Sequence, residues 1–306
     1  MGRPPSRISA SCSSESPPIA SSRTSTTPAA SWLRWRSCDN ETAMTHLTYE
    51  LAALLYLAAG TLGALARTRP RAAGGMVGLL ALGAGLHAVG FIGLHRQTPP
   101  VSLESFPAAL SLIAWLIVVA YLLCLRMFPI RSVGVWVGAA AGLVTLAADA
   151  ALRWLSPAAA GPHSGGTWSH AHVLLSAGGF SLLALASLAG LAYLAKERQL
   201  KHKRWPRLGL PSLEGLDRFE HLSLSLGFPL LTLGVISGFV WGADRGVSPW
   251  TGHSLWLLGA WAVYLLPVGL RVVRRQHGHL PARGVVLGFA LLAFSYVGIR
   301  LLGAVA

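Results

Sequence analysis

Long apolar runs alternate with short polar connections along most of the chain after residue 43. Runs of about 20 residues, the length of helix that crosses the hydrocarbon core of a bilayer, recur throughout this part of the sequence. The pattern predicts eight membrane-spanning helices, at about 46–66, 75–94, 107–127, 132–154, 170–195, 221–242, 251–271 and 284–304, with an uncertainty of several residues at each boundary. We therefore predict an all-α fold, the polytopic helical bundle of an integral membrane protein.

The first 43 residues follow a different pattern. They are rich in Ser, Pro, Thr and Arg and contain no apolar run. Such a segment cannot bury enough apolar surface to offset its ordering entropy, so residues 1–43 are predicted to be a disordered extension. Met44 stands directly before the first apolar run. We expect Met44 to be the natural start and the preceding residues to be a start-site artefact; the alternative is a genuine extension of a core that covers residues 44–306.

Positive charge is concentrated in every second connection. The chain carries a formal net charge of +14, although only 12% of its residues are charged and 53% are hydrophobic. Most Lys and Arg residues of the core lie in the odd-numbered connections, whereas the even-numbered ones hold Arg96, Arg153 and Arg245. This asymmetry predicts cytoplasmic odd connections in a bacterial plasma (inner) membrane, with both ends of the core outside. Charge confined to short loops fits membrane topology better than a nucleic-acid partner.

The fifth connection contains a segment with helical spacing of its apolar residues. In "LPSLEGLDRFEHLS", Leu213, Leu216 and Phe219 follow a proline at near-helical intervals. The spacing predicts an amphipathic segment that lies on the cytoplasmic surface and leads into the sixth span. An ordinary polar loop explains the same residues equally well.

The candidate chemistry lies in the histidines. Of the eleven histidines, His87 falls inside the second span, while His172 and His253 begin the fifth and seventh spans at a similar outer depth. An ionisable side chain within a membrane segment is costly and therefore indicates function. Neutral imidazole is a good ligand for iron, and histidines from two helices can bind a haem from both sides.

Tryptophans accompany the outer face of the predicted bundle. Trp241 ends the sixth span, and Trp250 and Trp256 lie on either side of the seventh-span histidine, where flat apolar rings could pack against a porphyrin. Simpler explanations stay open, because tryptophan is typical of membrane interfaces and an interfacial histidine often only faces water. The sequence has no HExxH, glycine-rich phosphate loop, nucleophile elbow or CxxC pair, so we predict no catalytic residue.

The C-terminal half resembles a known family. Four stretches occur in order: "HVLLSAGGFSLLALASLAGLAYLAKERQLKHKR", "LPSLEGLDRF", "LGFPLLTLGVISGFVWG" and "GHSLWLLGAWAVY". Together they resemble the cytochrome c assembly protein family, which includes the CcsA/ResC group and its HemX-like and YpjD-type relatives. The best match runs over residues 170–304, and the first four spans fit more loosely.

The resemblance implies a haem-binding membrane protein that takes part in c-type cytochrome biogenesis, handling or delivering haem at the outer face. By matching position, His172 and His253 are the expected axial ligands of the iron of haem b, and His87 is a further candidate within the membrane. The implied partners are membrane lipid, other cytochrome c assembly proteins and apocytochrome c, with no nucleic acid.

One stretch departs from the family pattern. The CcsA group has a tryptophan-rich external loop followed by Asp-Pro-Lys, whereas "WGADRGVSPWTGH" keeps a sparse set of tryptophans and lacks the Asp-Pro-Lys. This departure favours the HemX-like or YpjD-type branch, and an accessory haem-handling protein over a complete synthase. Two other functions stay open: a membrane scaffold or regulator without haem, and a small-solute or proton-coupled transporter that uses Asp149, Glu50 and His87 as a relay.

Overall fold

A computed structural model describes residues 28–65, 72–96, 102–154, 167–202, 210–244, 252–274 and 276–298. Within these ranges the chain forms helices and no β-strand, and eight helices are long and apolar enough to cross a membrane. The prediction of a polytopic helical bundle is therefore confirmed. The helices are α1 (Pro28–Leu65), α2 (Ala72–Arg96), α3 (Phe106–Cys124), α4 (Gly134–Trp154), α5 (Thr167–Lys201), α6 (Leu213–Asp244), α7 (Gly252–Val268) and α8 (His279–Ala293).

Three short helical segments complete the described part. A 3₁₀ turn, η1 (Arg131–Val133), leads into α4, and the π-helical turns η2 (Gly269–Val273) and η3 (Phe294–Gly298) follow α7 and α8. A π-helical turn widens the helix locally and is frequent at functional sites. In this protein η2 carries Arg271.

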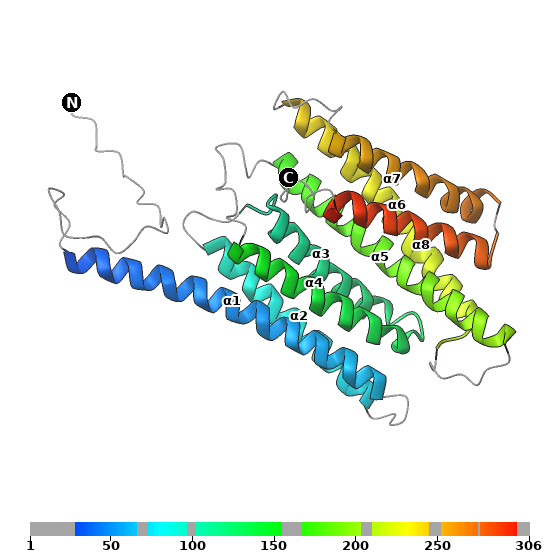
Figure 1. Ribbon diagram of the computed structural model, residues 1–306, viewed down its shortest axis with the longest axis horizontal. Coiled ribbons are helices and arrows are strands. Elements are labelled where there is room, and N and C mark those ends of the chain that lie inside the picture. The colour runs from blue at the N-terminus through cyan, green and yellow to red at the C-terminus, as the bar shows by residue number, and fades with distance from the viewer. Residues whose placement is uncertain are drawn as a thin grey trace.

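The helices alternate in direction along the bundle (Figure 1). Helices α1, α3, α5 and α7 end, and α2, α4, α6 and α8 begin, at the right-hand end of that view. The long helix α5 runs through the middle and packs against α3 on one side and against α6 and α8 on the other. Helix α1 packs against α2 and α4, while α7 packs mainly against α8 at the opposite side of the bundle.

Close helix crossings depend on glycine. A Cβ atom added to Gly138 of α4 would lie 2.6 Å from the Tyr56 carbonyl oxygen and 2.8 Å from the Gly60 nitrogen of α1. On α6, a Cβ at Gly227 would lie 3.1 Å from the backbone nitrogen of Leu183 in α5. Within lipid the hydrophobic effect does not bring helices together, so small residues that permit close backbone packing stabilise these two pairs.

Polar side chains add bonds between helices inside the bundle. Trp115 of α3 donates its ring N–H to the Ala84 carbonyl of α2 at 2.9 Å. Ser181 of α5 donates to the Ile113 carbonyl of α3 at 3.1 Å. Trp261 of α7 donates to Thr232 of α6 at 2.9 Å, and this bond ties the outermost helix to the bundle. Large aliphatic residues point outward instead, as expected of surfaces that face lipid chains.

The predicted spans agree with the observed helices to within a few residues, with two differences at the N-terminal sides of helices. The segment at residues 213–220 is the first part of α6 and does not lie apart as a surface element, because Leu216 and Phe219 are fully buried. Helix α1 already begins at Pro28, ahead of the predicted core start. Residues 1–27 lie outside the described part, so the expectation about the extension stays a prediction.

Candidate functional site

His172 is held in a defined orientation near the N-terminal end of α5. Its Nδ1 lies 2.8 Å from the Gly234 carbonyl oxygen of α6 and 3.5 Å from Ser176 Oγ. A carbonyl oxygen only accepts hydrogen bonds, so Nδ1 carries a hydrogen, and in the neutral imidazole the lone pair is then on Nε2. A histidine that ligates a metal is usually held in this way, with its other ring nitrogen bonded to a carbonyl or carboxylate.

Helix α6 also shapes the surroundings of this ring. The His172 and Trp241 rings stack with their centroids 5.9 Å apart and their planes 18° apart. A Cβ at Gly238 would lie 2.7 Å from His172 Cε1, so the imidazole rests directly on the glycine backbone. Gly234, Gly238 and Trp241 follow one another at intervals of one helical turn and share one face of α6. The structure therefore brings His172 and Trp241 together, whereas a role of the tryptophan as the wall of a haem site stays a prediction.

The structure describes the other predicted haem-site residues, His253, Trp250 and Trp256, only in part. His253 lies in the first turn of α7, but its side chain is outside the described part, as is the whole of Trp250. Trp256 of α7 is 55% exposed, and its ring meets Phe294 of η3 edge-on with centroids 6.3 Å apart. Trp256 therefore packs against the end of α8, and the pairing of His172 with His253 stays a prediction.

His87 occupies a separate environment in the first half of the bundle. It is fully buried on α2, with Nε2 2.7 Å from Ser111 Oγ of α3 and Nδ1 3.3 Å from the Tyr56 hydroxyl of α1. Phe91 stacks on the ring at 5.2 Å, and Tyr49 meets it edge-on at 5.1 Å. Both ring nitrogens have hydroxyl partners, so this geometry explains the buried histidine as a neutral group that joins three helices.

The acidic residues considered for a relay lie in the middle of α1 and near the C-terminal end of α4. Asp149 Oδ1 lies 2.6 Å from His46 Nδ1, and Asp149 Oδ2 lies 3.0 Å from the Arg153 guanidinium. The same guanidinium lies 2.5 Å from Glu50 Oε1. These contacts form an ion network that joins α1 to α4, whereas His87 contacts Tyr56 of α1, Phe91 of α2 and Ser111 of α3.

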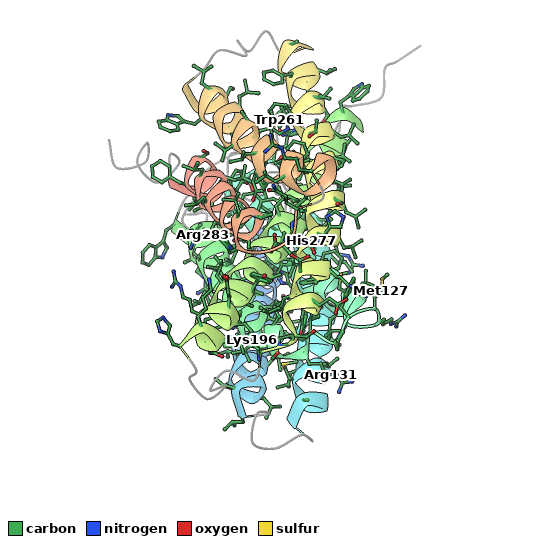
Figure 2. All side chains as sticks on the ribbon, turned by 90° about the vertical axis from the view of Figure 1, so that its right-hand side faces the viewer. Met127, Arg131, Lys196, Trp261, His277 and Arg283 are labelled. Carbon is green, nitrogen blue, oxygen red and sulfur yellow. The ribbon has the colours of Figure 1, made fainter. Side chains whose placement is uncertain are left out.

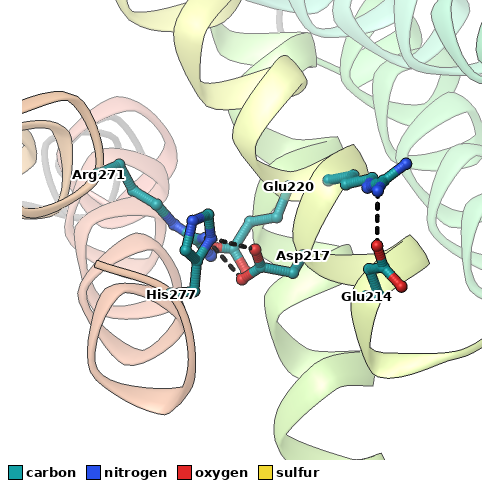
Figure 3. A network of polar contacts seen from close by, with 6 residues as sticks. Glu214, Asp217, Glu220, Arg271 and His277 are labelled. Atoms are coloured by element: carbon teal, nitrogen blue, oxygen red, sulfur yellow. Dashed lines mark hydrogen bonds and ion pairs between the residues drawn. The ribbon is translucent and has the colours of Figure 1, made fainter. Parts of the chain in front are cut away.

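A second cluster, which the sequence did not predict, lies at the opposite end of the bundle. Arg271 of η2 donates from one guanidinium nitrogen to Asp217 at 2.5 Å and from the other to Glu220 at 2.8 Å. His277, in the turn between η2 and α8, places Nδ1 2.7 Å from Asp217 Oδ2. We call Asp217, Glu220, Arg271 and His277 the inner cluster; Figure 3 shows its two carboxylates on α6 facing the arginine and the histidine.

The inner cluster sits within the end that carries the basic residues. Figure 2 looks onto this end and shows Arg131, Lys196, His277 and Arg283 distributed across it. Unlike these residues, Arg271 is buried, with its side chain only 1% exposed. The sequence held a signal for the cluster: two carboxylates three residues apart on a helical pattern, and an arginine at the very end of an apolar span. The positive-inside pattern explains Arg271 equally well as a basic loop residue, so its pairing with the carboxylates was not predicted.

The eight apolar helices define a polytopic helical membrane protein. Comparison with known sequences shows which family of such proteins the chain resembles. The family described as Cytochrome C assembly protein matches residues 104–306. The match covers more than half of the chain and includes α3 to α8, together with His172 and the inner cluster. The chain belongs to the cytochrome c assembly protein family.

Individual relatives match over shorter stretches. The cytochrome c biogenesis protein CcsA of Thermosynechococcus vestitus is 38% identical over 92 residues, which is 29% of this chain and 29% of that protein. CcsA of Chlamydomonas reinhardtii is 30% identical over 139 residues, 44% of this chain and 38% of that protein. CcsA of Guillardia theta is 29% identical over 155 residues, 44% of this chain and 52% of that protein. The chain thus spans between 29% and 52% of the length of these relatives.

Proposed function

We propose that this protein binds haem at its outer face and takes part in c-type cytochrome biogenesis by handling or delivering that haem. One observation carries the proposal: the Gly234 carbonyl fixes the hydrogen of His172 on Nδ1 and leaves the Nε2 lone pair available. The stacked ring of Trp241 supplies an aromatic neighbour at the same position. Membership of the cytochrome c assembly protein family supports the same conclusion.

The residues at this end fit a haem group in their chemistry. Imidazole Nε2 is an ordinary axial ligand, and aromatic side chains suit the apolar porphyrin faces. In this proposal His172 holds the iron of haem b, His253 at the start of α7 supplies the second imidazole, and Trp241, Trp250 and Trp256 contribute the apolar wall. When bound, haem supplies the redox-active iron, while the chain orients the ligand and excludes water.

The orientation in the membrane forms part of the proposal. Arg131, Lys196 and Arg283 lie together at one end of the bundle (Figure 2). By the positive-inside rule this end faces the cytoplasm, and the end with His172 faces outward in a bacterial plasma membrane. Several relatives are named cytochrome c biogenesis proteins. We therefore propose a membrane complex with other assembly proteins that presents haem to apocytochrome c.

The direct test is the visible absorption spectrum of the detergent-purified full chain, as isolated and after addition of haemin. The wild type is expected to show a Soret band, and a pyridine haemochrome spectrum is expected to identify haem b. His172→Ala should lose most of the bound haem, and His172→Gly should regain it when free imidazole is added. Imidazole rescue separates loss of a ligand from general damage to the fold.

A matched control uses another histidine at the same end of the bundle. His95 is exposed near the end of α2, so His95→Ala should leave the spectrum unchanged. His253→Ala should shift the spectrum from six-coordinate toward five-coordinate iron. A wild type that neither carries haem nor takes it up would refute the proposal and would favour a scaffold of the same fold.

A further inference from the structure

The inner cluster contains two carboxyl groups but one buried guanidinium, so one negative charge would be left over if both carboxyl groups were ionised. Arg271 is the buried cation, and it divides its two terminal nitrogens between Asp217 and Glu220. Both carboxylates lie on one face of α6, three residues apart. If both were ionised, two negative charges would share one guanidinium inside the helix bundle. A buried surplus charge is strongly disfavoured, and such groups become neutral instead.

The hydrogen bonds of the two carboxyl groups differ, and the difference indicates which of them is less well compensated. Asp217 uses both oxygens, Oδ1 for Arg271 at 2.5 Å and Oδ2 for His277 at 2.7 Å. Glu220 uses only Oε1, at the longer distance of 2.8 Å to Arg271. Among the described residues, Glu220 Oε2 has no hydrogen-bond partner, and the whole side chain is 0% exposed. The unpaired, buried oxygen therefore belongs to Glu220.

Among the described residues, Arg271 is the positively charged group that acts on Glu220. On the α5 side, a Cβ added to Gly190 would lie 3.5 Å from Oε2, so a glycine faces this oxygen. Glu197 at the same end of α5 pairs with Lys201 at 2.8 Å, and His279 Nδ1 lies 3.9 Å from the same carboxylate. His277 is 71% exposed and bonds to Asp217, so it connects the cluster to water. Among the described residues, Tyr193 on α5 and His221 on α6 also interact electrostatically with Asp217 and Arg271, and Arg283 on α8 interacts with Glu197.

We propose that Glu220 is a proton-binding site, whose carboxyl takes up a proton from water at Oε2 while Asp217 carries the charge that balances Arg271. The proton converts the carboxylate to a neutral carboxylic acid and leaves the Arg271 bond to Oε1 in place. The site lies at the end of the bundle opposite His172, and it stands independently of haem binding.

Infrared spectroscopy of the purified full chain tests this proposal, because a protonated carboxyl has its own C=O stretch, which shifts in D₂O. The wild type at neutral pH is expected to show this band, and Glu220→Gln is expected to lose it. Glu220→Asp keeps a carboxyl and is expected to shift the band, which covers the case in which the glutamine variant does not fold. Asp217→Asn leaves Glu220 as the sole counter-charge of Arg271, so the band should weaken although Glu220 is intact.

The matched control lies six residues before Glu220 on the same helix. Glu214 is exposed and pairs with Arg218 at 2.5 Å, as Figure 3 shows beside the cluster. Glu214→Gln should leave the band unchanged. A wild-type spectrum without a protonated-carboxyl band at neutral pH would overturn the proposal, as would a band that persists unchanged in both Glu220 variants.

Discussion

Removing the guanidinium of Arg271 should be among the most destabilising single changes in the described part of the chain. In Arg271→Met the methionine replaces much of the aliphatic stem, but the bonds to Asp217 at 2.5 Å and Glu220 at 2.8 Å are lost. The arginine side chain is 1% exposed, so water cannot replace it without opening the contact between α6 and η2. Breaking a buried ion pair by removing one partner costs about 3–5 kcal/mol, because the other charge is left uncompensated.

The assay is denaturant-induced unfolding of the purified protein, followed by circular dichroism. The exposed Arg274 lies one turn beyond Arg271, and Arg274→Met should change the free energy of unfolding by less than about 0.5 kcal/mol. Adding Asp217→Asn to Arg271→Met should recover part of the loss, because it removes the uncompensated charge, and a double-mutant cycle measures this recovery. Equal losses in Arg271→Met and Arg274→Met would refute the reasoning.

Three further changes test other contacts. Gly138→Leu should separate α1 from α4, since its Cβ would lie 2.6 Å from a backbone oxygen, and should greatly lower the yield of folded protein in detergent, measured by size exclusion. The control in the same assay is Gly78→Leu, because a Cβ at Gly78 would meet nothing within 4 Å. Thr232→Val removes the acceptor of the Trp261 ring N–H and should lower the free energy of unfolding by about 1 kcal/mol, measured by the same denaturation. Gly238→Ala should displace the His172 ring and weaken haem binding in a haemin titration, whereas unchanged affinity would argue against a ligand at this position.

Much of the fold could be predicted because each membrane span carries its own signal. An apolar run long enough to cross a bilayer must become a helix, since its backbone groups have no other partners in lipid. Connections that alternate in charge then fix the direction of successive helices. The same reasoning placed His172 at the start of the fifth span and Trp241 at the end of the sixth, and in the structure their two rings stack. A shared role of these rings in a haem site stays a prediction.

Contacts between helices were harder to predict, because hydropathy says how long a span is but not which neighbour it meets. The sequence pattern of Asp217 and Glu220 belongs equally to an amphipathic surface segment and to the first turns of a spanning helix. Only the packing of η2 against α6 shows that Arg271 lies between the two carboxylates. His87 illustrates the same limit, because its depth was predictable from the span, whereas its hydroxyl partners Ser111 and Tyr56 come from two other helices.

Helix α6 connects the two proposed sites, because it supplies partners to both. Its C-terminal half provides the Gly234 carbonyl that orients His172, and its N-terminal end provides the carboxylates that bind Arg271. Glu220 and Gly234 are separated by about 20 Å along the helix, at 1.5 Å per residue. Charge at one site is largely screened at the other over such a distance where water is present. An effect of Glu220→Gln on haem affinity would therefore have to act through the position of α6 against α5. The spacing of these two helices depends on Gly179 and Gly227, so a compensating substitution should be sought at these positions.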